Sequence, residues 1–260
     1  MTGGVKSQTR FFGWGILALA VLAIGLVAVF LLYAIQAYPN KLEAGQLGPW
    51  GDFFGGTLNP ILSTFTVLAL LYTIFLQRRE LEESSRAIRQ QNFEATFFKM
   101  LEMHNSILTN IDIHAKGNVF RGRDCFEKFF YLRLDGQFAR KTKQYSKNSA
   151  HVSPALEEII QEFWKQALSE LGHYYRYLYD LTKFADAYEG NNRFYIKIIR
   201  SQLSNHELAL LFYNCLSEHG AKMKPLVEKY ALLKHLPNDL LLDPSHKALI
   251  SPTAFGEEVT

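Results

Sequence analysis

The chain has 260 residues, of which 48% are hydrophobic and 20% are charged, and its formal net charge is +3 at pH 7. This length suits one domain with a small additional module, and so low a net charge does not by itself indicate a nucleic-acid-binding protein. The two cysteines, Cys125 and Cys215, belong to no CxxC or His-rich motif, so the sequence supports neither a disulfide framework nor a zinc site. We expect reduced thiols, no metal and no cofactor.

The N-terminal region contains the first of two uncharged stretches. Residues 14–34 carry no charge over 21 positions, and about 20 apolar residues cross the hydrocarbon core of a bilayer as a helix. A secretory signal peptide is the alternative, but its apolar region usually has about 7–15 residues and ends at a small-x-small site, which does not follow here. We predict a cytoplasmic N-terminus at residues 1–13 and a retained transmembrane helix at residues 14–36.

The second uncharged stretch predicts another transmembrane helix at residues 58–76. It is less apolar than the first, because it includes Asn59 and four hydroxyl side chains, Ser63, Thr64, Thr66 and Thr73. Such hydroxyls bond to their own helix or to a neighbouring helix, which lowers their cost in lipid and favours helix pairing. Pro60 is expected in the first turn, where its missing N–H does no harm. A buried helix of a soluble domain is the alternative interpretation.

The distribution of basic residues predicts the orientation in the membrane. Lys6 and Arg10 precede the first stretch and Arg78 and Arg79 follow the second, whereas the connection at residues 37–57 has a single basic residue. Cytoplasmic flanks carry an excess of Lys and Arg. The pattern therefore predicts a multi-pass protein with both termini in the cytoplasm, an external connection, and the lipid bilayer as a partner.

The external connection ends in an unusual glycine-rich segment, residues 51–60. Glycines permit backbone conformations that other residues avoid. One hypothesis is a re-entrant turn or a close helix contact that lines an ion path or senses an external signal. The alternative is a tight structural turn in which Thr57 or Asn59 caps the second membrane helix. The candidate residues for this turn and for gating are Asp52, Gly55, Gly56, Asn59 and Pro60.

A polar stalk helix is predicted at residues 77–115, continuing out of the membrane. Apolar residues recur along its second half at helical spacing, which indicates a face that packs against other helices. These residues are Phe93, Phe97, Leu101, Leu108 and Ile111.

The next segment, residues 116–150, is strongly basic, with nine basic residues against three acidic ones up to residue 147. It suits contact with anionic lipid just below the bilayer, or with RNA. A solvated, variable loop is the alternative. The candidate residues of this basic patch are Arg121, Arg123, Arg140, Lys141 and Lys143.

Residues 151–240 predict a helical bundle. A long amphipathic helix begins near Ser153, with a buried stripe at Leu156, Ile160, Phe163, Ala167, Leu171, Tyr175 and Leu178. Residues 189–192 interrupt the helical pattern, and a capping box at Ser204 and Glu207 starts an apolar, central helix. A further helix begins near Pro225, and the tail at residues 241–260 is irregular. We therefore expect an all-α fold, namely a two-helix transmembrane hairpin followed by a cytoplasmic helical bundle.

The motifs of common enzymes are not present. The Gly117 to Gly122 spacing imitates the start of a P-loop, but Arg123 and Asp124 replace its Lys-Ser/Thr pair. One weaker pattern remains: Arg200 and His206 are similar to the loose Arg-x(4–6)-His motif of HEPN-type ribonucleases, in which the Arg stabilises phosphate charge and the His transfers a proton. The alternative is that Arg200 pairs with an acid and that His206 lies in a helix cap.

Several strings resemble the phage abortive infection (AbiC-like) membrane proteins of bacteria. They are GDFFGGTLNP at 51–60, QRRE at 77–80, FEATFFKML at 93–101, YRYLY at 175–179, IRSQLS at 199–204 and LLFYN at 210–214. The resemblance covers residues 45–240 and implies antiphage defence, in which an infected cell stops growing or dies before virus is released. It implies no established reaction and no catalytic residues.

The leading hypothesis is a defence effector of the bacterial inner membrane. Its helical domain senses a phage-derived trigger, and its hairpin acts on the membrane as a homo-oligomer, because two spans alone cannot enclose a pore. A rival hypothesis is a tethered ribonuclease that uses Arg200 and His206 and is supplied with nucleic acid by the basic segment. A third is a non-catalytic scaffold that recruits a separate toxin or another partner protein of the defence system.

Overall fold

The structure is a computed structural model that describes residues 47–115, 117–139 and 154–257, together with isolated positions between residues 25 and 36. It divides into two units, residues 1–83 and 84–260, and each is treated by itself. The first predicted span, residues 14–36, and the N-terminus at residues 1–13 lie almost entirely outside the described residues. The predicted two-helix hairpin is therefore not shown.

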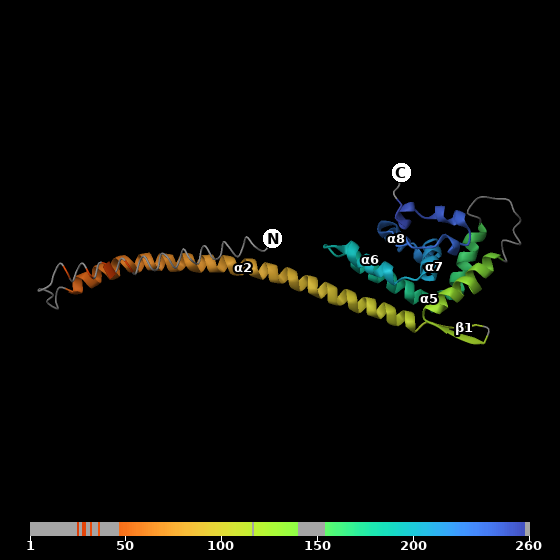
Figure 1. Ribbon diagram of the computed structural model, residues 1–260, viewed down its shortest axis with the longest axis horizontal. Helices are drawn as coiled ribbons and strands as arrows, with labels where there is room; N and C mark the ends of the chain where they lie inside the picture. Colours follow the sequence, from red (N-terminus) through yellow and green to blue (C-terminus); the bar gives the residue numbers. More distant parts are fainter. Residues whose placement is uncertain are drawn as a thin grey trace. The chain divides into compact units, whose positions relative to one another are not determined.

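The first described element is helix α2, Leu47–Thr109, which Figure 1 draws as one continuous helix. It contains the end of the predicted connection, the second predicted span and most of the stalk. The glycine-rich segment is therefore helical, so the predicted turn was wrong, whereas a close helix contact stays a prediction. Glycine and proline lower helix propensity but do not exclude a helix, so a long helix can run through such a segment.

The same finding corrects the predicted caps. Thr57 and Asn59 lie more than two turns inside α2 and cannot cap it, and Pro60 is an interior residue rather than a first-turn residue. Because proline has no N–H, the carbonyl four residues earlier, that of Gly56, loses its usual intrahelical donor. The hydroxyl of Thr64 donates to the carbonyl of Pro60 over 2.8 Å.

The second half of α2 belongs to the unit formed by residues 84–260. The predicted packed face is confirmed, since Phe97, Leu101, Leu108 and Ile111 are buried and Phe93 packs against the core. The ring of Phe93 stacks on that of Tyr188 with centroids 3.9 Å apart, within a larger aromatic cluster. Its other members are Phe97, Phe184 and Tyr195.

A β-hairpin follows α2, so the fold is predominantly helical rather than all-α. Strand β1, Asp112–Ala115, pairs antiparallel with β2, Asn118–Arg121, in the register Ile113 to Phe120. The stalk helix thus ends at Thr109 instead of residue 115. Gly117 and Gly122 have positive φ angles of 82° and 60°, so the P-loop-like glycine spacing serves two backbone turns.

The described part of the basic segment is folded. Helix α3, Arg123–Lys128, leads into a π-helical turn, η1, Phe129–Asp135, and both contribute buried side chains: Cys125, Phe126, Phe129, Phe130 and Leu134. Arg133 lies over the ring of Phe129 and donates to the carbonyl of Gln166 over 3.2 Å. The expectation of a solvated loop is wrong for residues 117–139.

The remaining helices match the predicted bundle closely. They are α5, Pro154–Asp186; α6, Asn192–Gln202; α7, Asn205–Cys215; and α8, Lys224–Tyr230. Every member of the predicted stripe on α5 is buried, from Leu156 to Leu178. All residues from Glu207 to Cys215 are buried, which makes α7 the central helix of this unit.

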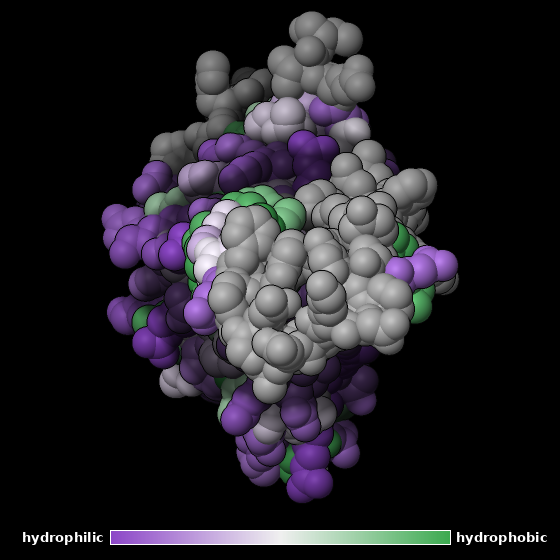
Figure 2. All heavy atoms as spheres, turned by 90° about the vertical axis from the view of Figure 1, so that its left-hand side faces the viewer, coloured by the Kyte–Doolittle hydropathy of each residue, from purple (hydrophilic) through white to green (hydrophobic). Residues whose placement is uncertain are grey.

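A short 3₁₀ turn at Glu218–Gly220 lies between α7 and α8, and three more follow α8, at Asn238–Leu240, Pro244–Leu249 and Pro252–Phe255. The last of these packs back on the chain, since Leu233 donates its N–H to the carbonyl of Ala254 over 3.0 Å. In the view of Figure 2, most of the coloured surface is hydrophilic and the hydrophobic atoms form smaller patches.

Candidate functional site

The most unusual polar group of the described chain is the carboxylate of Glu207, which is 1% exposed at the start of the central helix α7. The capping box fixes its position. The backbone N–H of Ser204 donates to Oε2 of Glu207 over 2.7 Å, and the N–H of Glu207 points back to the Ser204 hydroxyl at 3.4 Å. Two donors that a helix start leaves free are satisfied in this way.

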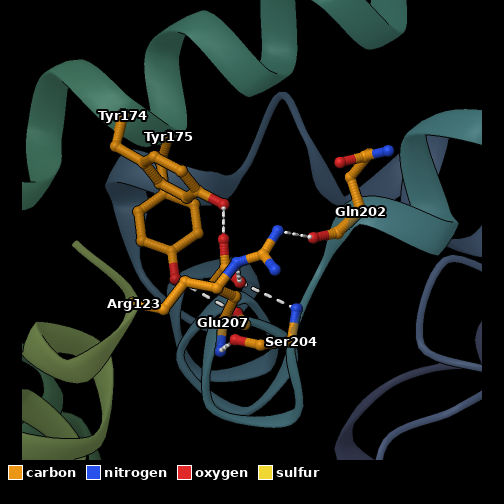
Figure 3. A network of polar contacts seen from close by, with 6 residues as sticks. All are labelled: Arg123, Tyr174, Tyr175, Gln202, Ser204 and Glu207. Atoms are coloured by element: carbon orange, nitrogen blue, oxygen red, sulfur yellow. Dashed lines mark hydrogen bonds and ion pairs between the residues drawn. The ribbon is translucent and has the colours of Figure 1, made fainter. Parts of the chain in front are cut away.

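Other elements supply further donors to Glu207, as Figure 3 shows. The hydroxyl of Tyr174 on α5 donates to its Oε1, and the hydroxyl of Tyr175 donates to its backbone carbonyl over 3.1 Å. Nε of Arg123 on α3 lies 3.6 Å from Oε2, and Nη2 of Arg123 donates to the carbonyl of Gln202 at the end of α6 over 2.7 Å. The carboxylate of this cluster therefore connects α3, α5 and α7, and Arg123 adds the end of α6 through the carbonyl of Gln202.

The buried carboxylate of Glu207 stabilises the domain only while its hydrogen-bond and charge partners are in place. A buried charge is costly unless it is paired and hydrogen-bonded, and here it has both kinds of partner. Burial raises the pKa of Tyr174 and Tyr175 well above the usual value, and the charge of Glu207 raises both further. The two tyrosines therefore stay protonated and remain donors. Arg123, whose side chain is half-exposed, is the member of the cluster that reaches the surface.

His104 on α2 lies against this cluster. Its ring centroid is 4.7 Å from that of Tyr174, it is 2% exposed, and neither ring nitrogen has a hydrogen-bond partner among the described residues. Burial lowers its pKa to about 4, although the charge of Glu207 acts in the opposite direction. His104 is therefore neutral at pH 7, and its protonation would place a charge inside the core.

The ribonuclease candidates, Arg200 and His206, have different surroundings. Nη1 of Arg200 donates to the carbonyl of Ala231, just after α8, over 3.2 Å. The ring of His206 lies in the first turn of α7 beside Phe130 and Tyr131 of η1, with centroids 6.0 and 5.5 Å away. The chain does break between α6 and α7 as predicted, but the described contacts lead the two side chains to separate elements.

The other predicted site residues fall into two groups. Of the basic patch, Arg121 is exposed on β2, Arg123 is engaged by Glu207 and Gln202, and Arg140, Lys141 and Lys143 lie outside the described residues. The membrane candidates Asp52, Gly55, Gly56, Asn59 and Pro60 all lie within α2. A role in gating stays a prediction for them.

Sequence reasoning found the capping box but not the site built on it. Ser204 and Glu207 were recognisable from their spacing, whereas Arg123 is separated from Glu207 by more than 80 positions and carries no local signal for this contact. Among the residues that the structure describes, no group of three or more His, Cys, Asp or Glu side chains is placed to hold a metal ion.

Together, these elements define a predominantly helical protein, and one helix among the described residues is long and apolar enough to cross a membrane. Residues 166–241 match the family model described as "Putative phage abortive infection protein". The resemblance to that family is therefore confirmed over less than a third of the chain, a segment that holds Tyr174, Tyr175 and Glu207. Searches of the curated proteins and of the solved structures find no significant match.

The first prediction concerns Arg123, which is expected to stabilise the domain through Glu207. Removing it by Arg123→Ala leaves a buried carboxylate with one partner fewer and should lower the free energy of unfolding by about 1–2 kcal/mol. The matched control Arg121→Ala changes an exposed arginine two residues away and should stay within about 0.5 kcal/mol. Denaturant unfolding of the detergent-solubilised chain measures both.

A double-mutant cycle makes this prediction specific. In a Glu207→Gln background the buried charge is gone, so Arg123→Ala should cost clearly less than in the wild-type chain. Equal costs in the two backgrounds would show that Arg123 acts through Gln202 or through packing alone.

The second prediction concerns pH. The pKa of His104 is about 4 in the folded chain, below an unfolded value of about 6.5, so protons favour unfolding and stability is lost as pH falls below about 6.5. Between pH 7 and pH 5 this effect amounts to about 2 kcal/mol. His104→Phe should remove that part of the pH dependence and leave the part due to His246, whose pKa burial also lowers.

His173→Phe, at an exposed position of the neighbouring helix α5, is the matched control. It should leave the difference in unfolding midpoint between pH 7 and pH 5 unchanged. If His104→Phe also leaves this difference unchanged, His104 is not the buried neutral base described above.

Proposed function

We propose that the chain is a membrane-anchored effector of abortive infection in bacteria. In this proposal the helical domain responds to a phage-derived trigger, and the membrane part of the chain acts on the inner membrane as a homo-oligomer. The family match at residues 166–241 supports the defence role. The exposed apolar part of α2 supports the role at the membrane.

The observation that carries the proposal is the apolar stretch of α2. The most apolar window of the helix has none of its residues buried, and eight large apolar side chains of this stretch are about half-exposed or more. Burying such a side chain contributes about 1.5–3 kcal/mol, so leaving a series of them in water is very unfavourable. They are Ile61, Leu62, Phe65, Val67, Leu68, Leu70, Leu71 and Phe75. Lipid covers a stretch of this length without any protein partner.

The continuity of α2 gives the proposal a physical route between sensing and action. The same helix that carries the apolar stretch contributes Phe97, Leu101 and Leu108 to the core of the helical domain. A rearrangement of that core would therefore act on a helix that continues into the membrane part of the chain. Orientation follows the basic residues, with Arg78 and Arg79 and both termini on the cytoplasmic side.

The third prediction tests the membrane role. An arginine at the centre of a spanning helix costs about 2.5–3.5 kcal/mol, so Leu68→Arg with Leu71→Arg should keep residues 58–76 from crossing the bilayer, while the first predicted span, residues 14–36, still anchors the chain. The matched control Leu81→Arg lies on the same helix, in a stretch that is exposed and polar, and should leave the crossing unchanged. Digestion of a C-terminal tag by protease added to spheroplasts provides the measurement: the tag should be protected in the wild-type chain and in the control, and digested in the double variant.

The same three strains test the defence role. Cells that express the wild-type chain or Leu81→Arg should give several-fold fewer plaques than cells that lack the protein, and their membranes should depolarise during infection. Cells that express the double variant should show neither effect. Wild-type cells that resist phage with an intact membrane potential would exclude action on the membrane. Degraded total RNA in those cells would favour the ribonuclease hypothesis instead.

A further inference from the structure

A polar stripe runs along the apolar part of α2. It consists of positions spaced alternately by three and four residues: Gly56, Asn59, Ser63, Thr66, Leu70, Thr73 and Gln77. This spacing places them on one side of a helix, as in the contact seam of a coiled coil. All of them except Leu70 are small or polar, within a stretch that is otherwise strongly apolar.

The stripe is not covered by the described chain. Every one of its residues is exposed, whereas the half-buried residues of this stretch, Ala69, Tyr72 and Leu76, form a different face. With 3.6 residues per turn, that face is centred about a third of a turn away from the stripe. Whatever covers Ala69, Tyr72 and Leu76 thus leaves the polar stripe free.

The polar groups of the stripe differ in how well the helix satisfies them. The hydroxyls of Thr66 and Thr73 donate to the carbonyls of Leu62 and Ala69, each over 2.8 Å. The side-chain amides of Asn59 and Gln77 have no hydrogen-bond partner among the described residues, and the carbonyl of Gly56 has lost its donor to Pro60. Within the predicted span, residues 58–76, an unsatisfied group such as the amide of Asn59 costs several kcal/mol in hydrocarbon, so it is not left facing lipid. Gln77 and the carbonyl of Gly56 lie at the two edges of this span.

We infer that the polar stripe is the face on which copies of this chain meet in the membrane. This inference rests on the proposed function, because it requires α2 to span the bilayer. All copies are inserted in the same direction, so equivalent residues meet at the same depth. A carboxamide carries both donors and an acceptor, so Asn59 can pair with Asn59 of the next copy and Gln77 with Gln77.

The geometry of the stripe suits this partner. A repeat of 3.5 residues matches helices that pack in parallel with a left-handed supercoil. The small side chains of Gly56, Ser63 and Thr66 allow the backbones to approach closely, as at many helix contacts in membranes. The same face continues to Asp52 at one end and Glu80 at the other, where like charges of neighbouring copies repel. The close contact is therefore confined to residues 56–77.

Disulfide cross-linking in native membranes tests the inference. Thr66→Cys and Thr73→Cys place thiols on the stripe, seven residues apart. Leu68→Cys and Phe75→Cys are the matched controls, also seven residues apart, on the opposite side of the helix. Membranes from cells that express each full-length variant are oxidised with copper phenanthroline and analysed on non-reducing gels. The wild-type chain, whose Cys125 and Cys215 are buried, supplies the background.

The inference predicts at least fivefold more covalent dimer from Thr66→Cys and Thr73→Cys than from the two controls. Equal cross-linking at all four positions overturns the inference. It is also overturned if the stripe cysteines give no covalent dimer but form a disulfide within one chain once a second cysteine is placed within residues 14–36, because the chain would then cover its own stripe. Protein that stays in carbonate-washed membranes without stripe-specific dimers contradicts this inference alone. Protein that is released by the wash contradicts the proposed function and this inference with it.

Discussion

The constraint on which the account depends is an apolar helix that the described chain does not cover. Helix α2 carries a stretch with large side chains exposed around much of its circumference, long enough for the hydrocarbon core of a bilayer. Water does not stabilise such a stretch, and in the proposed function lipid covers it. The polar stripe then divides the circumference into a lipid-compatible part and a part that requires a polar partner. In the proposed function, both the location and the assembly of the protein depend on this one helix.

The helical domain depends on a different balance. Its central helix α7 begins with a buried carboxylate, and elements from distant parts of the chain converge on it. Removing one partner of a buried charge is costly, so the cluster of Glu207, Tyr174 and Arg123 defines one arrangement of α3, α5 and α7. Neutral His104 places α2 against the same cluster. The apolar surroundings keep His104 uncharged. The packing of α2 against the bundle therefore depends on His104 staying neutral as well as on apolar contacts.

Much of the bundle was predictable from local signals. The buried stripe of α5, the break before α6, the capping box at Ser204 and the apolar α7 each express a repeat or a motif within a dozen or so residues. The β-hairpin was not predicted because its strands have four residues each, too few for a clear alternation of polar and apolar residues. The glycine-rich turn was wrong because glycine and proline lower helix propensity without excluding a helix, and α2 runs through this segment although Pro60 donates no hydrogen bond to the carbonyl of Gly56. The contact of Arg123 with Glu207 depends on the tertiary fold, so no local spacing in the sequence predicts it.

The polar stripe lies between these cases. The sequence indicates its residues separately, as hydroxyls that lower the apolar character of the second span and as members of a glycine-rich segment. They share one face only because a single helix, α2, runs through both segments. Asp52, Gly56 and Asn59 then lie on one side, whereas Gly55 and Pro60 do not extend the three-four spacing. Of the five candidate residues, Gly56 and Asn59 belong to the proposed contact face, and Asp52 lies at its end, where like charges of neighbouring copies repel.

The most direct measurement of the central claim is a spin-label scan of residues 56–77, one label at a time, in the full-length protein reconstituted into bilayers. The account predicts that collision with oxygen, which concentrates in lipid, varies with a period of about 3.6 residues, with maxima near Leu68 and Phe75 and minima at Asn59, Thr66 and Thr73. Uniform accessibility to a water-soluble nickel reagent along the whole stretch, with no oxygen periodicity, would contradict both the membrane span and the face on which the copies meet.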